Sequence, residues 1–401
     1  MKHAGSADLA LMGGSIPTWL FDRMVRLSRP IVEAIVLEYG QKAFLSRMSD
    51  PFWFQSFGAV IGMDWNSSGV TTAVMSALKQ SLRPQARELG IYICGGKGKD
   101  SMQTPAELLN IGDQTGLDGA YLAKCSRLSA KVDNTAIQDG FQIYLHSFIL
   151  SAQGDWTVIQ QGMQPKTAKA RRYHWHSGTF DAFTEAPHTA ICGEHQGEIL
   201  NLVDKNALVT QNGILAIARE HPDKILGEIP HMKLPTYCDI KEKDVDLKRL
   251  GSILWLAQEN EVQQFEDLLL LQGLGPRTLQ SLTLVSEVIH GTPSRFSDPA
   301  RFAFAHGGKT GRPFPVPTHV YDETIKTLTN AVEKAKIGDD DKSKAIKKLT
   351  ELAQQAEPRF TPNDQFDAYL QKERNDAWKY GGRTVKGFSK KEDEGGQLSL
   401  F

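Results

Sequence analysis

The sequence contains few cysteines, and they are widely separated. The four are Cys94, Cys125, Cys192 and Cys238, and no two of them form a Cys-x-x-Cys pair. This spacing argues against a zinc ribbon and gives no basis for a disulfide framework. We therefore expect free, buried thiols.

Long hydrophobic runs and an excess of charge of either sign are also absent. No apolar run is long enough to cross a bilayer, and residues 1–8 lack the apolar core of a signal peptide. We therefore expect a cytoplasmic protein without a membrane partner. The 46 basic and 47 acidic residues give a net charge of −1, which argues against a protein that coats DNA by bulk attraction. A contact with DNA would have to be local.

The pattern of apolar residues changes along the 401 residues of the chain. Helical spacing predicts helices over residues 19–36 and 67–82, and Ser49-Asp50-Pro51 predicts the start of another. Alternating patterns then predict strands. These cover residues 90–94, 141–150, 156–163, 171–176 and parts of 188–203. Helical patterns return after Lys205, over residues 244–258, 261–271, 276–290, 318–336 and 342–355.

These patterns predict an α+β fold with two domains and a tail. Residues 1–205 are expected to form a mixed α/β domain with a mixed sheet, and this domain carries the candidate catalytic site. Residues 206–378 are expected to form an all-α domain. Residues 379–401 are rich in Gly, Lys, Glu and Ser and predict a flexible tail.

A turn between two apolar helical segments resembles the helix-hairpin-helix motif of DNA repair proteins. Residues 269–279 read Leu-Leu-Leu-Gln-Gly-Leu-Gly-Pro-Arg-Thr-Leu, within a motif over residues 261–290. Gly273 and Gly275 allow positive φ angles in a tight turn and close approach of a phosphate to the backbone. Pro276 favours the first turn of the next helix.

The same turn predicts a grip on the DNA backbone rather than on the bases. Free N–H groups at the helix start, including that of Thr278, can bind a phosphate oxygen, and Arg277 can add a charge-assisted bond. The alternative is an ordinary corner between two helices. Leu279 departs from the motif, in which many members carry alanine here. A glycine-rich loop over residues 306–312 offers Lys309 and Arg312 as a second phosphate contact.

The last five residues resemble the peptide by which bacterial polymerases and repair proteins bind the DNA sliding clamp. They are Gln397, Leu398, Ser399, Leu400 and Phe401. An extended segment of this kind places apolar side chains in a groove while the glutamine provides a polar anchor. We therefore expect the bacterial clamp as a partner; the alternative is an arbitrary chain end.

Carboxylates, histidines and arginines gather around the predicted sheet. Asp133 and Asp139 precede it, and the other candidates lie on its strands or after them: His146, Arg171, Arg172, His174, His176 and His188. Such residues suit a Mg²⁺ or Mn²⁺ phosphodiesterase, in which Asp133 and Asp139 hold the metal. Tyr173 and Trp175 are candidates to stack on an unpaired base. The alternative is that both aspartates are helix caps or loop residues.

Several short runs, taken together, resemble the bacterial and archaeal family known as domain of unknown function 763. The runs cover residues 49–55, 95–99, 132–134, 160–163, 171–175 and 304–309. The resemblance extends to about Leu352 and implies no settled activity. The clamp-like peptide looks like an addition to this shared body.

The leading hypothesis is a structure-selective, metal-dependent DNA endonuclease of repair or replication, associated with the nucleoid. His146 or His174 would act as base or ligand, Arg171 and Arg172 would meet the phosphate, and the DNA would be branched, bubbled or a single-strand/duplex junction. One alternative is a non-catalytic adaptor that binds DNA structures and is tethered to the clamp. A DNA glycosylase is disfavoured, because Asp298 beside Pro299 is the only aspartate after the hairpin in a comparable setting.

Overall fold

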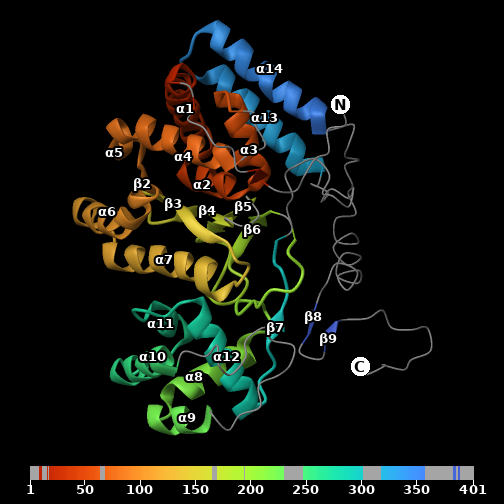
Figure 1. Cartoon of the computed structure of the whole chain (residues 1–401). Helices are drawn as coiled ribbons and strands as arrows, with labels where there is room; N and C mark the ends of the chain where they lie inside the picture. The colour runs from red at the N-terminus through yellow and green to blue at the C-terminus, as the bar shows by residue number, and fades with distance from the viewer. Residues whose placement is uncertain are drawn as a thin grey trace, which may run out of the picture.

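The computed structural model describes residues 9–10, 16, 18–63, 68–164, 169–193, 195–229, 247–300, 318–356, 383–384 and 387–388. These residues build a layered molecule in which a sheet lies between two sets of helices, with a further helical region beyond (Figure 1). The α+β class predicted from the sequence is confirmed.

One antiparallel sheet occupies the middle of the molecule (Figure 1). Its strands are β1 (Leu9–Ala10), β2 (Ile91–Lys97), β3 (Gln142–Ser151), β4 (Trp156–Gln164), β5 (Lys169–His176) and β6 (His188–Cys192). Their order is β1-β5-β4-β3-β2, and β6 also pairs with β5. The sequence predicts a mixed sheet, but every pairing described within this sheet is antiparallel. Hairpin connections make this the simpler arrangement.

Strict alternation along the strands gives each face of the sheet its own core. On β3, Phe148 and Leu150 pack with the helices on one side, whereas Ile149 packs with those on the other. The same alternation on β5 separates Tyr173 from His174. Neighbouring residues of β5 therefore belong to different environments, which decides the chemistry of the candidate site.

One face of the sheet is covered by helices from both ends of the sequence (Figure 1). They are α1 (Thr18–Tyr39), α2 (Gln41–Ser49), α3 (Pro51–Ile61), α4 (Ser68–Leu82), α13 (Thr318–Lys334) and α14 (Asp339–Ala356). The predicted start of α3 is present, because the Asp50 carboxylate accepts a hydrogen bond from the N–H of Trp53 at 2.7 Å. Helices α13 and α14 pack on α1 and α3, so the described helices after residue 206 do not form the one separate domain that the sequence predicts over residues 206–378.

The opposite face is covered by two helices that the sequence patterns did not indicate, α6 (Lys99–Thr115) and α7 (Gly119–Lys131). They cross closely, since a Cβ on Gly112 would lie 2.7 Å from the Cα of Gly119. A short 3-10 turn (Arg83–Gln85) and α5 (Ala86–Leu89) precede β2. A π-helical turn (Val132–Ala136) follows α7.

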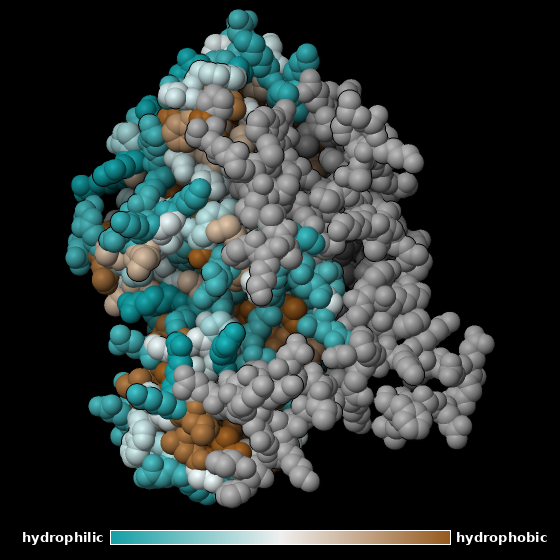
Figure 2. Space-filling model, viewed as in Figure 1, coloured by the Kyte–Doolittle hydropathy of each residue, from teal (hydrophilic) through white to brown (hydrophobic). Residues whose placement is uncertain are grey.

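The remaining helices form a region beyond α7 (Figure 1). They are α8 (Leu208–Arg219), α9 (Pro222–Glu228), α10 (Leu247–Glu259), α11 (Phe265–Leu270) and α12 (Pro276–His290). Figure 2 shows a hydrophobic area over this region, where Leu208, Val209 and Trp255 are among the exposed hydrophobic side chains. No helix of the described residues is both long and apolar enough to span a membrane.

A small second sheet involves four residues of the predicted tail. Strand β7 (Arg295–Phe296) pairs with β8 (Arg383–Thr384), which pairs with β9 (Gly387–Phe388). This part of the tail is therefore in contact with the folded body. The free cysteines Cys94, Cys125 and Cys192 are buried, as predicted, and Cys238 lies outside the described residues.

Candidate functional site

The predicted hairpin joins α11 and α12 through residues 271–275. Two hydrogen bonds between residues three apart shape the turn. One runs from Leu271 N–H to Leu268 O (3.1 Å) and the other from Leu274 N–H to Leu271 O (3.2 Å). Gly273 has φ +85°, a conformation that favours glycine. Gly275 has φ −127°, so the positive φ expected there is not found. Its lack of a side chain instead leaves the start of α12 open.

The start of α12 lies at the surface and is uncapped. Gly273, Pro276 and Arg277 are exposed, and Gly275 is partly so. Gly275 provides no side-chain cap, and among the described residues no backbone group accepts from the N–H of Arg277 or Thr278. The side chain of Thr278 is buried, so only its N–H is available for a contact. These orphan donors carry the positive end of the helix dipole.

Three side chains bind the carbonyl groups of the hairpin. Lys131 Nζ donates to Leu274 O at 2.8 Å, and Gln138 Nε2 donates to Pro276 O at 2.8 Å. Arg249 Nη2 donates to Gly273 O at 3.3 Å. Burial lowers the pKa of Lys131. The hairpin is thus fixed through its acceptors to α7, to Gln138 after the π-helical turn and to α10, while the N–H groups of Arg277 and Thr278 stay open.

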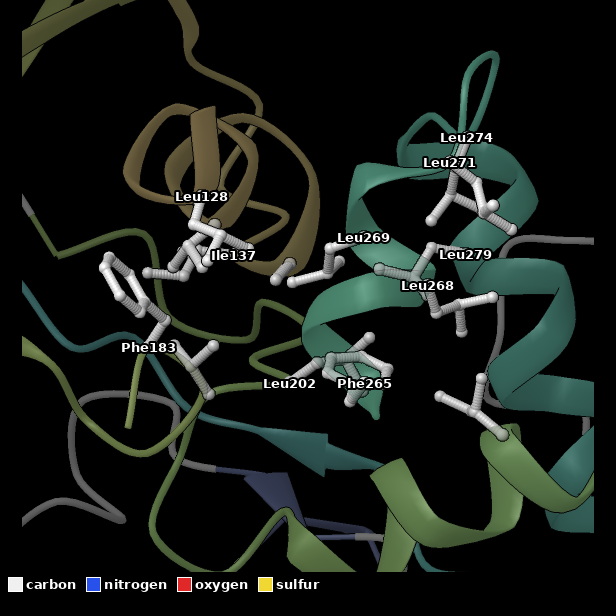
Figure 3. Close-up of a cluster of buried hydrophobic side chains, with 14 of the residues drawn as sticks. Leu128, Ile137, Phe183, Leu202, Phe265, Leu268, Leu269, Leu271, Leu274 and Leu279 are labelled. Carbon is white, nitrogen blue, oxygen red and sulfur yellow. The ribbon is translucent and has the colours of Figure 1, made fainter. Parts of the chain in front are cut away.

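Apolar side chains of the hairpin pack against the hydrophobic core of the molecule (Figure 3). Leu269, Leu274 and Leu279 point from α11, the turn and α12 into a buried cluster that also contains Leu128 of α7 and Ile137. Leu279, where the motif often has alanine, is fully buried. The larger residue therefore fills space between the hairpin and the rest of the core.

Asp133 lies in the π-helical turn, and its carboxylate is fully buried. Its Oδ1 lies 2.5 Å from His188 Nε2, and its Oδ2 accepts from Gln160 Nε2 (2.5 Å) and Trp175 Nε1 (3.0 Å). Burial raises the pKa of Asp133, and the contacts with His188 and Trp175 oppose that shift. Asp133 is thus saturated by its own neighbours.

His146 belongs to the same buried network. Its Nε2 lies 2.8 Å from Ser126 Oγ, and its Nδ1 lies 2.9 Å from Gln160 Oε1. Burial lowers the pKa of His146 to about 4, so the ring is neutral at pH 7. Both ring nitrogens are occupied, which leaves neither for a substrate.

Asp139 and Arg171 form a second network with Asp298. The Arg171 Nη1 donates to Asp139 Oδ2 and to Asp298 Oδ1, both at 3.0 Å, and Nη2 donates to Asp298 Oδ2 at 2.5 Å. Tyr173 Oη donates to Asp139 Oδ2 at 2.6 Å. Burial raises the pKa of Asp139 to about 6, opposed first by Arg171. The network joins the sheet to the segment that follows α12.

Arg172, His174 and His176 alternate with Arg171 and face the α1–α4 layer. The Arg172 guanidinium lies 4.6 Å from the Phe54 ring centre, and its Nε donates to His174 Nε2 at 2.9 Å. Its Nη2 has no hydrogen-bond partner within the described part of the chain. Burial lowers the pKa of Arg172, and burial followed by the Arg172 charge lowers that of His174. His176 Nδ1 lies 3.2 Å from both Trp156 O and Thr157 Oγ1.

The structure does not bring the predicted metal ligands into one site. Asp133 and Asp139 belong to different networks, and no group of three or more His, Cys, Asp or Glu able to hold a metal occurs among the described residues. A hard cation needs several free oxygen ligands, so these carboxylates do not fit Mg²⁺ or Mn²⁺ as they stand. Tyr173 and Trp175 are fully buried and are not base-stacking residues.

Some predicted residues lie outside the described part of the chain. These are Lys309, Arg312 and the clamp-like peptide of Gln397, Leu398, Ser399, Leu400 and Phe401. Other important residues were not predicted. Gln160 faces His146 across the β3–β4 hairpin, so the strand register alone would have indicated it. The sequence singles out Asp298 only as an aspartate after the hairpin, and no local signal links it to Arg171, because the two residues are distant in sequence.

The comparisons with known proteins agree with the family resemblance. The model of the family described as "Protein of unknown function (DUF763)" matches residues 5–316, which ends before the Leu352 expected from the sequence runs. No curated protein and no solved structure matches the chain. Because the family match covers most of the sequence, the chain belongs to the family Protein of unknown function (DUF763).

Proposed function

We propose that the protein binds the sugar-phosphate backbone of DNA through the hairpin at residues 271–278. The observation that carries the proposal is the uncapped, exposed start of α12, where the N–H groups of Arg277 and Thr278 lack backbone partners among the described residues. A phosphate oxygen satisfies such donors and interacts favourably with the helix dipole. The Arg277 side chain adds a charge-assisted bond.

The fixed carbonyl groups support this proposal. Lys131, Gln138 and Arg249 hold the hairpin by its acceptors, so no rearrangement is needed before a phosphate reaches the donors. A preorganised site loses less free energy to ordering on binding.

The test is DNA binding by the full chain, measured by fluorescence anisotropy with duplex, branched, bubble and single-stranded probes. Arg277→Ala should weaken binding about tenfold, the equivalent of about 1.4 kcal/mol. It should also reduce the slope of log affinity against log salt by about one. Lys326→Ala, which removes an exposed cation from α13, is the control and should bind as the wild type does.

Gly275→Ala provides a second, independent arm. The backbone there allows alanine, and a Cβ would meet nothing closer than Arg249 Nη2 at 3.8 Å. The fold should persist, while the added methyl group obstructs the phosphate and weakens binding. Wild-type affinity in both Arg277→Ala and Gly275→Ala would rule the proposal out.

The proposal extends to repair or replication, with the terminal peptide as the link to the sliding clamp. Leu398, Leu400 and Phe401 would fill the clamp groove and Gln397 would anchor the peptide, with Ser399 between them. Deleting residues 397–401 should abolish capture on immobilised clamp and leave DNA binding unchanged. Capture that survives the deletion would contradict this part.

A non-catalytic adaptor fits the geometry better than a nuclease. The carboxylates proposed for metal binding are buried and saturated, whereas a nuclease needs oxygen ligands open to both cation and substrate. Incubation with each probe in Mg²⁺, Mn²⁺ or EDTA separates the two. Binding without cleavage supports the adaptor. Metal-dependent cleavage lost in both Asp133→Asn and Asp139→Asn would support the nuclease instead.

A further inference from the structure

An open groove lies between α4 and the edge strand β2, apart from the hairpin. Its volume is about 430 Å³, and its lining includes Ser76, Lys79, Gln80, Arg83, Gly96 and Lys97. Pockets for small molecules usually measure about 300–1,000 Å³. The groove is therefore large enough for a compact ligand, and hydrophilic residues predominate along the α4–α6 edge in Figure 2.

Lys79 lines the groove and is held there by hydrogen bonds. Its Nζ donates to Gly95 O at 2.7 Å and to Glu107 Oε1 at 2.8 Å. Glu107 Oε2 in turn accepts from Gly95 N–H at 2.6 Å. The three residues form a rigid polar unit, and Glu107 offsets the charge of Lys79.

Because Glu107 offsets the charge of Lys79, the positive charge of the groove comes from Arg83 and Lys97. Both side chains are exposed, and neither makes an ion pair within the described part of the chain. Lys97 Nζ lies 5.9 Å from the ring centre of Tyr144. Asp100 is the one acidic residue of the lining, so cations outnumber carboxylates there.

The glycine run beside the groove shapes the edge of β2 and leaves one backbone donor, the N–H of Lys97, directed outward. Gly95, Gly96 and Gly98 all have positive φ, and a Cβ on Gly95 would lie 2.2 Å from His146 O. Because β2 is at the sheet edge, alternate N–H groups point away from β3. The N–H of Gly95 points to Glu107 in this way, and the next N–H with the same direction belongs to Lys97.

We propose that this groove binds a phosphate group, carried either by a nucleotide or by a nucleic-acid strand. A phosphate offers several acceptor oxygens and up to two negative charges, which match an arginine fork, a lysine and an outward N–H. The proposal does not depend on the hairpin. Residues 138–147 connect the two places, which limits their separation to about 30 Å.

The test uses the full chain with Arg83→Ala and Lys97→Ala combined. Both residues are exposed, so the double variant should fold normally. Arg87→Ala is the control, because Arg87 is an exposed cation on α5 beside the groove and does not line it. AMP binding is measured by calorimetry, and binding of a labelled single strand by fluorescence anisotropy.

The two sources of phosphate give different results. If the ligand is a nucleotide, AMP binds the wild type and Arg87→Ala but binds the double variant about tenfold more weakly. If it is a strand, AMP does not bind, and the double variant loses about tenfold in strand affinity while Arg87→Ala is nearly unchanged. Absence of AMP binding together with equal strand affinity would overturn the proposal. Arg277→Ala reports on the hairpin separately, since it should leave AMP binding intact.

Discussion

The hairpin and the polar networks on β5 differ in whether their polar groups have hydrogen-bond partners within the protein. In the networks, the carboxylates of Asp133 and Asp139 are buried and occupied by neighbouring donors. In the hairpin, neighbouring side chains occupy the carbonyls and leave the N–H groups of Arg277 and Thr278 open. A polar group can serve a ligand only if it is both reachable and unsatisfied. By that criterion the networks stabilise the fold, and the hairpin is the place where we propose that a ligand binds.

The largest expected effect concerns the two adjacent arginines of β5. Arg171→Met leaves Asp139 and Asp298 buried without their cation and should cost about 3–5 kcal/mol in free energy of unfolding. Arg172→Met removes a buried guanidinium with no carboxylate partner in the described structure and should cost about 2 kcal/mol or less. Urea denaturation measures both. Equal losses would contradict a structural role for the Arg171 network.

A second prediction concerns pH and His146. Its folded pKa of about 4 lies below the usual 6.5, so the folded state disfavours the protonated ring. Below pH 6.5 the unfolded chain gains a proton that the folded chain does not, and stability falls by about 1.4 kcal/mol per pH unit until about pH 4. Above pH 6.5 this loss is absent.

The measurement is the free energy of unfolding of the wild type and of His146→Gln as a function of pH. The contributions of the other titrating groups largely cancel in the difference between the two proteins. From pH 7.5 to 4.5, the stability advantage of the wild type should fall by up to roughly 3 kcal/mol. A difference that does not change with pH would show that His146 is not held neutral by burial.

The smallest expected effect is the difference in stability loss between alanine substitutions at the two hairpin glycines. Gly273→Ala places a side chain at φ +85° and should cost about 1–2 kcal/mol in stability. Gly275→Ala, at φ −127°, should cost about 1 kcal/mol or less, mainly through the weaker helix cap. Thermal unfolding of the two variants checks the order. A larger loss for Gly275→Ala would mean that its role is structural rather than to keep the amides open.

Local patterns in the sequence predicted much of the fold. The Asp50-Pro51 cap, the β3–β4 hairpin and the turn at Gly273 all depend on neighbouring residues, and the structure has them. The sequence patterns did not indicate α6, whose interior contains Pro105. Nor did they show that α13 and α14 return to pack on α1 and α3, because such packing depends on contacts between distant segments.

The candidate site was predictable only where its chemistry is local. The donors of α12 follow from the Gly-x-Gly-Pro turn itself. The state of Arg171 follows from Asp298, and that of Asp133 from Gln160 and His188, all far along the chain. Residue type alone could not distinguish a carboxylate ready for a metal from one saturated by buried partners.

The most direct measurement follows the backbone amides of the hairpin by nuclear magnetic resonance as duplex DNA is added to the full chain. If the hairpin holds the phosphate, the amide signals of Gly275, Arg277 and Thr278 shift progressively as DNA is added. Those of the buried β5 residues Tyr173 and Trp175 should stay in place. DNA that binds while the signals of these three amides stay unchanged would show that the hairpin is not the binding site.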